Sequence, residues 1–591
     1  MQSAAGRLAA SSDRGWGGRV RAPVLIRLGI ILVVTTLVSA GCLSGSENDE
    51  SGSRSSQGPP HPLELTDVAH AVGLNFRQGV FRWGVSADPG AMLGGGICWL
   101  DYDEDGWLDL FAVNSYAERE VSRWEAAGGL PRTALFRNVE GKFVDVSADS
   151  GADLAVRGNG CVAADLDLDG HMDLYVTTLR QSVLLWNNGD GTFTEGARPA
   201  GVGVYGWHSG AAVGDVNRDG LPDLLVAGYA DLNGPRPEAT QGFPQTYVGV
   251  RDLLFLNEGT GEGEHATFRE VGREAGLEVA SFGYGLGVLL SDFERDGDLD
   301  IYVANDTNPN RLYENVAWPG GADADPAGLG FRFEERAAAA GVADPNAGMG
   351  IAGGDYDGDG RTDLFVTNAR EQVHGVFRSK PPDENDPSFD DVRADLGVEL
   401  GGSTGWGVSW ADLDLDTDLD LVVVNGDIPV TDLTGDKQLI QAFGDLAAQG
   451  TPGRFEDLGG EIGLDGVGPL LARGSAAADY DNDGDLDVAV GSVGGSLVLL
   501  ENEQVGGGWL EVQLDGFHPG AEITAVLPDG RKLRREVQAG SSYLSSEDPR
   551  AHFGLGGAAE VQELVVRWPD GEETRLTDVA ANQLLEVEAP S

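Results

Sequence analysis

Seven short segments of this chain place carboxylates at alternating positions, and their spacing suits one kind of chemistry. The first runs Asp101-Tyr-Asp-Glu-Asp-Gly-Trp-Leu-Asp109. Oxygen side chains at positions 1, 3, 5 and 9 of a tight loop suit a hard cation that takes six to eight oxygen ligands, and Gly at position 6 permits the sharp turn. The pattern therefore predicts calcium binding. We number the segments loops 1 to 7: 101–109, 165–173, 215–223, 292–300, 355–363, 412–420 and 479–487.

The predicted calcium ligands occupy positions 1, 3, 5, 7 and 9 of each loop, for up to seven ions. They are Asp101, Asp103, Asp105, Trp107, Asp109; Asp165, Asp167, Asp169, His171, Asp173; Asp215, Asn217, Asp219, Leu221, Asp223; Asp292, Glu294, Asp296, Asp298, Asp300; Asp355, Asp357, Asp359, Arg361, Asp363; Asp412, Asp414, Asp416, Asp418, Asp420; and Asp479, Asp481, Asp483, Asp485, Asp487. In loop 6, Thr417 replaces the turn Gly. A residue with a Cβ is strained at positive φ, so this site is predicted to be the weakest.

The elements around the loops exclude a helical calcium site. An EF-hand loop needs a bidentate Glu at position 12 and a helix on each side. Here position 12 is apolar, and it falls in a short run rich in branched and aromatic residues, such as Leu110-Phe-Ala-Val113 or Leu174-Tyr-Val-Thr177. Such runs are typical of strands that are covered on both faces.

The repeat extends well beyond the loop. A Gly lies five residues before each loop, which predicts a crowded backbone position, and a third hydrophobic segment and an aromatic-anchored turn follow each loop. The pattern therefore predicts four strands in each unit. Seven units that cannot each bury both faces favour a closed ring, so we predict an all-β fold: a seven-bladed β-propeller over residues 63–505. An open solenoid is the alternative, but it would need capping repeats.

These repeats resemble the FG-GAP/VCBS family of calcium-binding propeller repeats. Residues 506–591 resemble an ASPIC/UnbV domain of the kind found in the cartilage acidic protein family and its bacterial relatives. The strings His552-Phe-Gly-Leu-Gly556 and Arg567-Trp-Pro-Asp-Gly571 carry this second resemblance. The alternation of apolar and polar residues there predicts about six short strands in a small β-sandwich or barrel.

The N-terminus indicates export. Arginines precede the apolar run Leu28–Val38, which is short for a membrane span, and small residues then lead to Cys42. This resembles a bacterial lipobox, which implies a signal peptide over 1–41, lipidation of Cys42, a flexible tether over 42–62 and a lipid-anchored protein at the cell surface. That surface would be the outer membrane if the cell has two membranes. A plain cleaved signal and a secreted protein is the alternative.

The net charge of the chain limits the kinds of partner that it can bind. The net charge is −56, from 96 acidic and 40 basic residues, and nucleic-acid binding needs the opposite sign. Seven divalent cations would neutralise only part of this charge, so calcium is expected to support folding as well. Cys98 and Cys161 remain in the mature chain, either as a disulfide between neighbouring units or as two buried thiols.

No catalytic constellation emerges. Gly401-Gly-Ser-Thr-Gly405 fits a nucleophile-elbow pattern, but a propeller strand follows where a helix is needed. His208 lies seven residues before loop 3, at a position where the other units have Gly or Ala, and Trp406 and Arg473 lie close to the equivalent position in their own units. They are candidates to face a ligand at one ring opening, with ordinary packing as the alternative.

The leading hypothesis is therefore a binding protein and not an enzyme. It would be a calcium-stabilised, surface-anchored module that engages an extracellular protein or a polysaccharide, and that meets the membrane only through its lipid. The alternative is a polysaccharide-active or biosynthetic enzyme that uses the channel face, with His208 and Arg473 as its only candidate pair. The irregular insertions 115–134, 229–252, 316–331 and 427–454 are candidate partner contacts, since recognition is concentrated on loops carried by rigid scaffolds.

Overall fold

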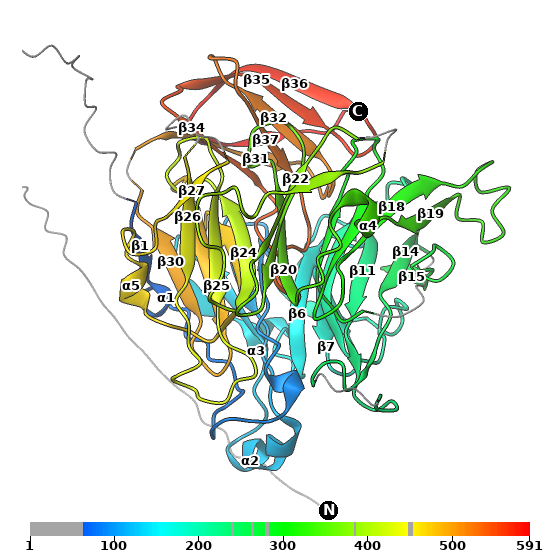
Figure 1. The fold of residues 1–591 in the computed structure, drawn as a ribbon, viewed down its shortest axis with the longest axis vertical. Coiled ribbons are helices and arrows are strands. Elements are labelled where there is room, and N and C mark those ends of the chain that lie inside the picture. The colour runs from blue at the N-terminus through cyan, green and yellow to red at the C-terminus, as the bar shows by residue number, and fades with distance from the viewer. Residues whose placement is uncertain are drawn as a thin grey trace, which may run out of the picture. The chain divides into compact units, whose positions relative to one another are not determined.

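Seven four-stranded antiparallel sheets follow one another along the described part of the chain (Figure 1). This computed structural model describes residues 63–237, 242–261, 265–277, 283–382, 386–446, 453–504 and 506–590. The predicted signal peptide, Cys42 and the tether lie outside these residues. No helix in the described part is both long enough and apolar enough to cross a membrane.

The first four sheets, each given from its first to its fourth strand, are these: β2 (Ile97–Leu100), β3 (Asp109–Ala112), β4 (Ala134–Asn138) and β5 (Phe143–Asp145); β6 (Gly158–Ala164), β7 (Asp173–Thr178), β8 (Val183–Asn187) and β9 (Phe193–Glu195); β10 (His208–Gly214), β11 (Asp223–Gly228), β14 (Leu253–Thr260) and β15 (Ala266–Glu270); and β16 (Gly285–Ser291), β17 (Asp300–Asn305), β18 (Arg311–Ala317) and β19 (Phe331–Glu335). In each sheet the cation loop joins the first two strands, as the repeat predicts.

The last three sheets are β20 (Gly348–Gly354), β21 (Asp363–Asn368), β22 (Gly375–Ser379) and β23 (Phe389–Asp391); β24 (Gly405–Ala411), β25 (Asp420–Asn425), β26 (Gln441–Asp445) and β27 (Phe455–Asp457); and β28 (Ala472–Ala478), β29 (Asp487–Ser492), β30 (Val498–Asn502) and β1 (Leu65–Asp67). The final sheet thus takes its outer strand from the beginning of the described chain. Leu65 pairs with Asn502, which ties the two ends of the ring together.

The ring is closed. The first strand of each sheet packs against the first strand of the next, in the order β2, β6, β10, β16, β20, β24 and β28, and β28 returns to β2. The Gly before each loop permits this approach: a Cβ on Gly350 would lie 2.1 Å from the main-chain oxygen of Trp406 in the neighbouring sheet. This is a seven-bladed β-propeller, so the predicted fold class is confirmed.

The connections between the strands carry the remaining secondary structure. They hold the helices α1 (Ala69–Val72), α2 (Val121–Ala126), α3 (Ser147–Ser150), α4 (Ala337–Ala340) and α5 (Leu464–Val467), the 3₁₀ turns Pro89–Ala91 and Glu118–Glu120, and the small ribbon β12 (Ala230–Asp231) with β13 (Val248–Gly249). Cys98 in β2 and Cys161 in β6 form a disulfide between the first two blades.

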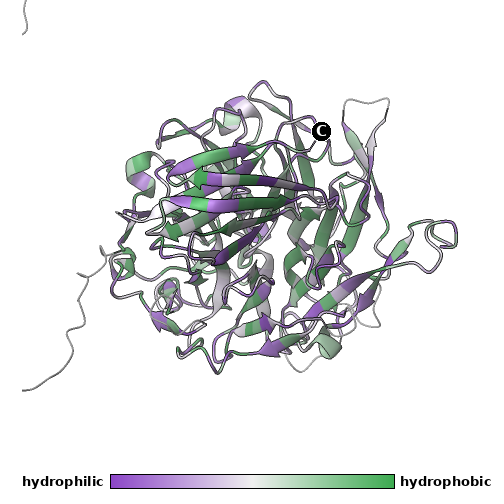
Figure 2. Cartoon of the chain, turned by 90° about the horizontal axis from the view of Figure 1, so that it is seen from above, coloured by the Kyte–Doolittle hydropathy of each residue, from purple (hydrophilic) through white to green (hydrophobic). Residues whose placement is uncertain are grey.

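The C-terminal residues form a small β-sandwich of seven strands, against an expectation of about six. One sheet holds β31 (Gly508–Leu514), β34 (Ala551–Gly556) and β37 (Gln583–Val587), and the other holds β32 (Glu522–Val526), β33 (Lys532–Glu536), β35 (Glu560–Arg567) and β36 (Glu573–Ala580). Their inward residues, among them Leu510, Ile523 and Phe553, share one hydrophobic core. Outward polar residues alternate with them (Figure 2).

A segment of this domain fills the propeller channel. We call residues 539–546, between β33 and β34, the plug. Ile351 and Ser542 exchange two main-chain hydrogen bonds (2.9 and 2.7 Å), and Cys161 donates to the Leu544 carbonyl (3.2 Å). Tyr543 is fully buried, and its hydroxyl donates to the Leu93 carbonyl at 2.8 Å. No sequence pattern predicted this insertion.

Candidate metal centres

The first aspartate of every loop organises the turn. In loop 1, Asp101 accepts main-chain hydrogen bonds from Asp105 (3.1 Å) and Gly106 (2.9 Å). The bond from position 6 recurs in the other six loops, from Gly170, Gly220, Gly297, Gly360, Thr417 and Gly484. These hydrogen bonds within the loop therefore define the shape of its turn.

The ninth aspartate is fixed by two elements. Asp109 accepts from the main-chain N–H of Tyr102 (3.0 Å) and from that of Asn138 at the end of β4 (2.7 Å). The same two bonds recur at Asp173, Asp223, Asp300, Asp363, Asp420 and Asp487. Burial raises the pKa of Asp109 to about 8, although both oxygens accept hydrogen bonds. A cation close by would stabilise the charged form.

The predicted ligands converge. In loop 1, one oxygen from each of Asp101, Asp103 and Asp109 lies within 4.8 Å of the others. Within the described residues the same holds for Asp165, Asp167 and Asp173; Asp355, Asp357 and Asp359; Asp412, Asp414 and Asp420; and Asp479, Asp481 and Asp483. Loops 3 and 4 carry Asn217 and Glu294 at position 3.

Two buried oxygens fit a cation in particular. Asp103 Oδ1 and Asp167 Oδ1 have no hydrogen-bond partner, and the Asp167 side chain is only 1% exposed. An unpaired buried carboxylate oxygen is costly, and coordination would satisfy it. At position 7, Trp107 and Leu221 have no side-chain oxygen, so only their main-chain carbonyls could coordinate. The donor set consists of oxygens and fits a hard cation such as calcium.

Loop 6 differs at its turn. Thr417 has a φ of +96°, within the +84° to +99° of the glycines at the same position in the other loops. It is buried, and its hydroxyl lies 2.5 Å from Nη1 of Arg531 in the C-terminal domain. The left-handed conformation that Thr417 was expected to adopt is present.

An asparagine links neighbouring loops, and sequence reasoning gave it no role. Asn187, whose main-chain N–H holds Asp173, donates its side-chain amide to the Tyr102 carbonyl of loop 1 at 2.8 Å. Asn138, Asn257, Asn315 and Asn502 make the equivalent contact with the preceding loop of the ring. Ser379 and Asp445 stand at this place in the fifth and sixth blades. The Asn that recurs at the end of the third strand is the sequence feature that could have predicted this contact.

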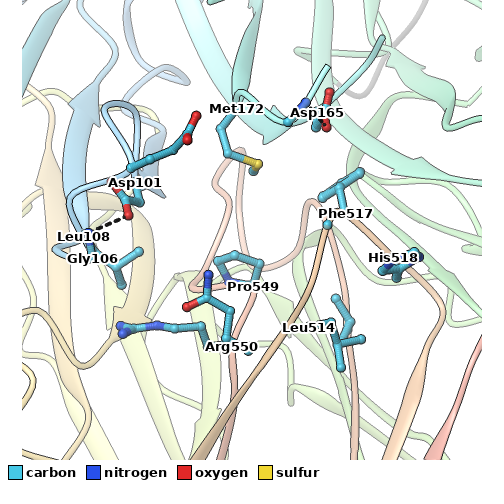
Figure 3. A pocket seen from close by; sticks show the side chains of 15 residues that line it. Asp101, Gly106, Leu108, Asp165, Met172, Leu514, Phe517, His518, Pro549 and Arg550 are labelled. Carbon is cyan, nitrogen blue, oxygen red and sulfur yellow. Dashed lines mark hydrogen bonds between the residues drawn. The ribbon is translucent and has the colours of Figure 1, made fainter. Parts of the chain in front are cut away.

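The C-terminal domain lies on the face of the ring that carries the loops (Figure 1). Arg567 of β35 lies 3.3 Å from Asp292 of loop 4, and Arg550 donates to the Asp479 carbonyl of loop 7 at 2.9 Å. Beside loops 1 and 2 a cavity of about 170 Å³ remains, lined by Asp101, Asp165, Phe517 and Arg550 among others (Figure 3).

His208, Trp406 and Arg473 are all buried. The Arg473 guanidinium stacks 3.9 Å from the centre of the Trp406 ring and donates to the Met92 carbonyl at 2.7 Å. Tyr543 of the plug packs edge-on against Trp406, with the two ring centres 4.9 Å apart. His208 lies apart in β10, where burial lowers its pKa to about 4. All three side chains are packed in the interior, so the structure does not present them to a ligand.

The fold and the loops define a β-propeller built from acidic loop repeats and joined to a C-terminal β-sandwich. Residues 101–176, 169–226 and 292–366 match the FG-GAP-like repeat, and residues 514–591 match the ASPIC and UnbV domain. The chain therefore carries FG-GAP repeats followed by an ASPIC/UnbV domain, as its resemblances implied.

Two animal proteins are similar to this chain over most of its length. The chain is 25% identical to cartilage acidic protein 1 of Homo sapiens over 539 residues, which cover 84% of this chain and 72% of that protein. It is also 25% identical to cartilage acidic protein 1 of Mus musculus, covering 84% and 74%. A solved Agrocybe aegerita lectin, described as recognising non-reducing terminal N-acetylglucosamine, is 15% identical with a TM-score of 0.36, covering 61% of this chain and 82% of that chain, a likeness too slight to carry an argument.

Proposed function

We propose that this chain is an exported, surface-anchored, calcium-binding propeller that acts as an interaction module for an extracellular protein or polysaccharide. The converging carboxylates with unpartnered buried oxygens carry the calcium part of this proposal. The matching families bear the names of repeat proteins and not of enzymes, which supports an interaction role. The anchor would be the lipid on Cys42.

Calcium would be held by the aspartates at positions 1, 3, 5 and 9 and by the carbonyl at position 7 of each loop. When bound, it supplies positive charge where four like-charged side chains meet. Because it would bind the folded chain and not the unfolded one, it would also stabilise the ring.

Chelation tests this part directly. Thermal unfolding of the full chain in calcium and in EDTA should show a large loss of melting temperature on chelation, and atomic emission should count up to seven calcium ions per chain. Magnesium at the same concentration is the control, because it demands tighter octahedral geometry. An unchanged melting temperature would refute structural calcium.

The insertion 115–134 offers a contact surface. Its Trp124 packs edge-on against Trp83, with ring centres 4.7 Å apart, and Arg82 lies over both rings. Trp83 is 37% exposed, although its neighbours hold it firmly. Rigid Trp and Arg side chains are typical of interaction hot spots. This surface lies near α2, at the bottom of Figure 1.

Trp83→Ala should therefore weaken binding of the labelled protein to whole cells or to immobilised polysaccharides. Tyr205→Ala is the matched control, since Tyr205 is 71% exposed and lies in another blade. Equal binding by the two variants would remove this surface from the proposal. The enzyme alternative is tested by His208→Ala: a loss of polysaccharide degradation would revive it.

A further inference from the structure

The C-terminal domain divides the seven loops into two sets. The turn residues of loops 1 to 3, Gly106, Gly170 and Gly220, are exposed, whereas those of loops 6 and 7, Thr417 and Gly484, are buried. Loops 4 and 5 are intermediate at this position. We call loops 1 to 3 the open loops and loops 4 to 7 the covered loops.

Each covered loop faces at least one arginine of the C-terminal domain. Arg567 pairs with Asp292 of loop 4, and Arg534 donates to the Thr362 hydroxyl of loop 5 at 2.9 Å. Arg550 donates to the Asp479 carbonyl of loop 7.

Arg535 is a further arginine beside loop 6. Its Nη2 is buried without a hydrogen-bond partner, and the carboxylates whose charge acts on the guanidinium are Asp412 and Asp355. The first aspartates of loops 4 to 7 therefore each have a guanidinium nearby. No such pairing is present at Asp101, Asp165 or Asp215 within the described residues.

The domain is also shaped to fit these loops. Gly556 donates its main-chain N–H to the Leu415 carbonyl at 2.8 Å, and a Cβ on Gly554 would lie 2.1 Å from Asp412 Oδ2. His552 Nε2 lies 2.9 Å from the Gly484 carbonyl. The string 552–556 is therefore a contact with loops 6 and 7, and Gly554 leaves the space that the Asp412 side chain occupies.

We propose that the covered loops are the docking site of the C-terminal domain, held through Arg534, Arg535, Arg550 and Arg567, and that cation in these loops controls how firmly the domain and its plug are seated. The open loops bind and release cation without affecting docking. This inference rests on the proposed calcium binding. Its physical basis has two parts. An arginine that contacts a metal ligand is held only while that carboxylate stays in place, and a loop of like charges without its cation opens by repulsion.

A matched pair of substitutions tests the proposal in the full chain. Asp483→Asn in covered loop 7 and Asp169→Asn in open loop 2 both change the fifth position, and both aspartates are exposed. Each variant should lose one calcium ion. Hydrogen exchange of the peptide 537–550 should rise by about tenfold in Asp483→Asn, as expected for local opening, and by less than about twofold in Asp169→Asn.

The outcomes separate the two proposals. Equal exchange in the two variants, with one ion lost from each, overturns the docking proposal and leaves calcium binding intact. Absence of bound calcium from the unaltered protein overturns calcium binding and the docking proposal with it.

Arginine variants provide a second measurement that leaves the loops intact. Arg567→Gln should raise exchange in the same peptide, and Arg567→Lys should restore part of the protection, because it keeps the charge. Arg575→Gln is the control, since Arg575 lies on the neighbouring strand β36 and pairs only with Glu563 and Glu573 within the described residues. A rise of the same size in Arg575→Gln would contradict the proposed role of Arg567.

Discussion

At the scale of single residues, one side chain sets loop 6 apart from its six equivalents. Thr417 adopts the left-handed conformation that glycine supplies elsewhere, at an expected cost of about 1–2 kcal/mol. The hydrogen bond to Arg531 offsets part of this strain. The strain would be felt most where the loop must close around a cation.

Thr417→Gly should therefore tighten calcium binding at loop 6 by about fivefold, which corresponds to about 1 kcal/mol of relieved strain. A chelator-competition titration should show one weak site in the unaltered protein and none in the variant. Thr417→Ser keeps both the hydroxyl and the Cβ, so its weak site should remain. A tightening in Thr417→Ser as well would assign the effect to something other than backbone strain.

At the scale of elements, the asparagine that ends the third strand in five of the blades joins one loop to its neighbour. Asn187 is buried and bonds to the carbonyls of Tyr102 and Met172. Because the main-chain N–H of the same residue fixes Asp173, the end of β8 connects two cation loops. The asparagine contacts thus join loops 6, 7, 1, 2, 3 and 4 into one series, and loop 5 is left out because Ser379 and Asp445 replace the asparagine in the fifth and sixth blades.

Asn187→Ala should destabilise the protein by about 2–3 kcal/mol, because two carbonyls are left buried without a donor. Asn188→Ala is a control in the next position: Asn188 is exposed, and within the described residues its side-chain amide bonds only to the hydroxyls of Thr192 and Thr194. Chemical unfolding in calcium measures both. Similar midpoints for the two variants would mean that the link between loops carries little stability.

The elements also show what the sequence could predict and what it could not. Asp101 to Asp109 predicted a cation loop because the chemistry is local, and seven copies made the blade and its strands predictable. The plug was not predictable, since Gly540 to Ser546 has no periodicity and its contacts are distant: Tyr543 and Leu93 are 450 positions apart. The pair of Arg567 and Asp292, which are 275 positions apart, was not predictable for the same reason.

At the scale of the whole molecule, burial of so many carboxylates makes stability depend on pH. Burial raises the pKa of Asp109 to about 8, of Asp165 and Asp355 to about 6, and of Asp479 to about 7, all above the ordinary value of 3.8. In the metal-free protein the folded state therefore binds more protons than the unfolded state over this range. The stability contributed is complete below about pH 4 and is lost as pH rises through these values.

Calcium should reverse this dependence. Its ligands must be deprotonated, so binding strengthens as pH rises and replaces the protons that otherwise neutralise the loops. In EDTA the melting temperature should be higher at pH 5.5 than at pH 8, whereas in excess calcium it should be higher at pH 8. Thermal scans at both pH values, with EDTA and with calcium, in buffers matched for ionic strength, give the four melting temperatures to compare. The same order of melting temperatures with and without calcium would show that the buried carboxylates do not act through the cation.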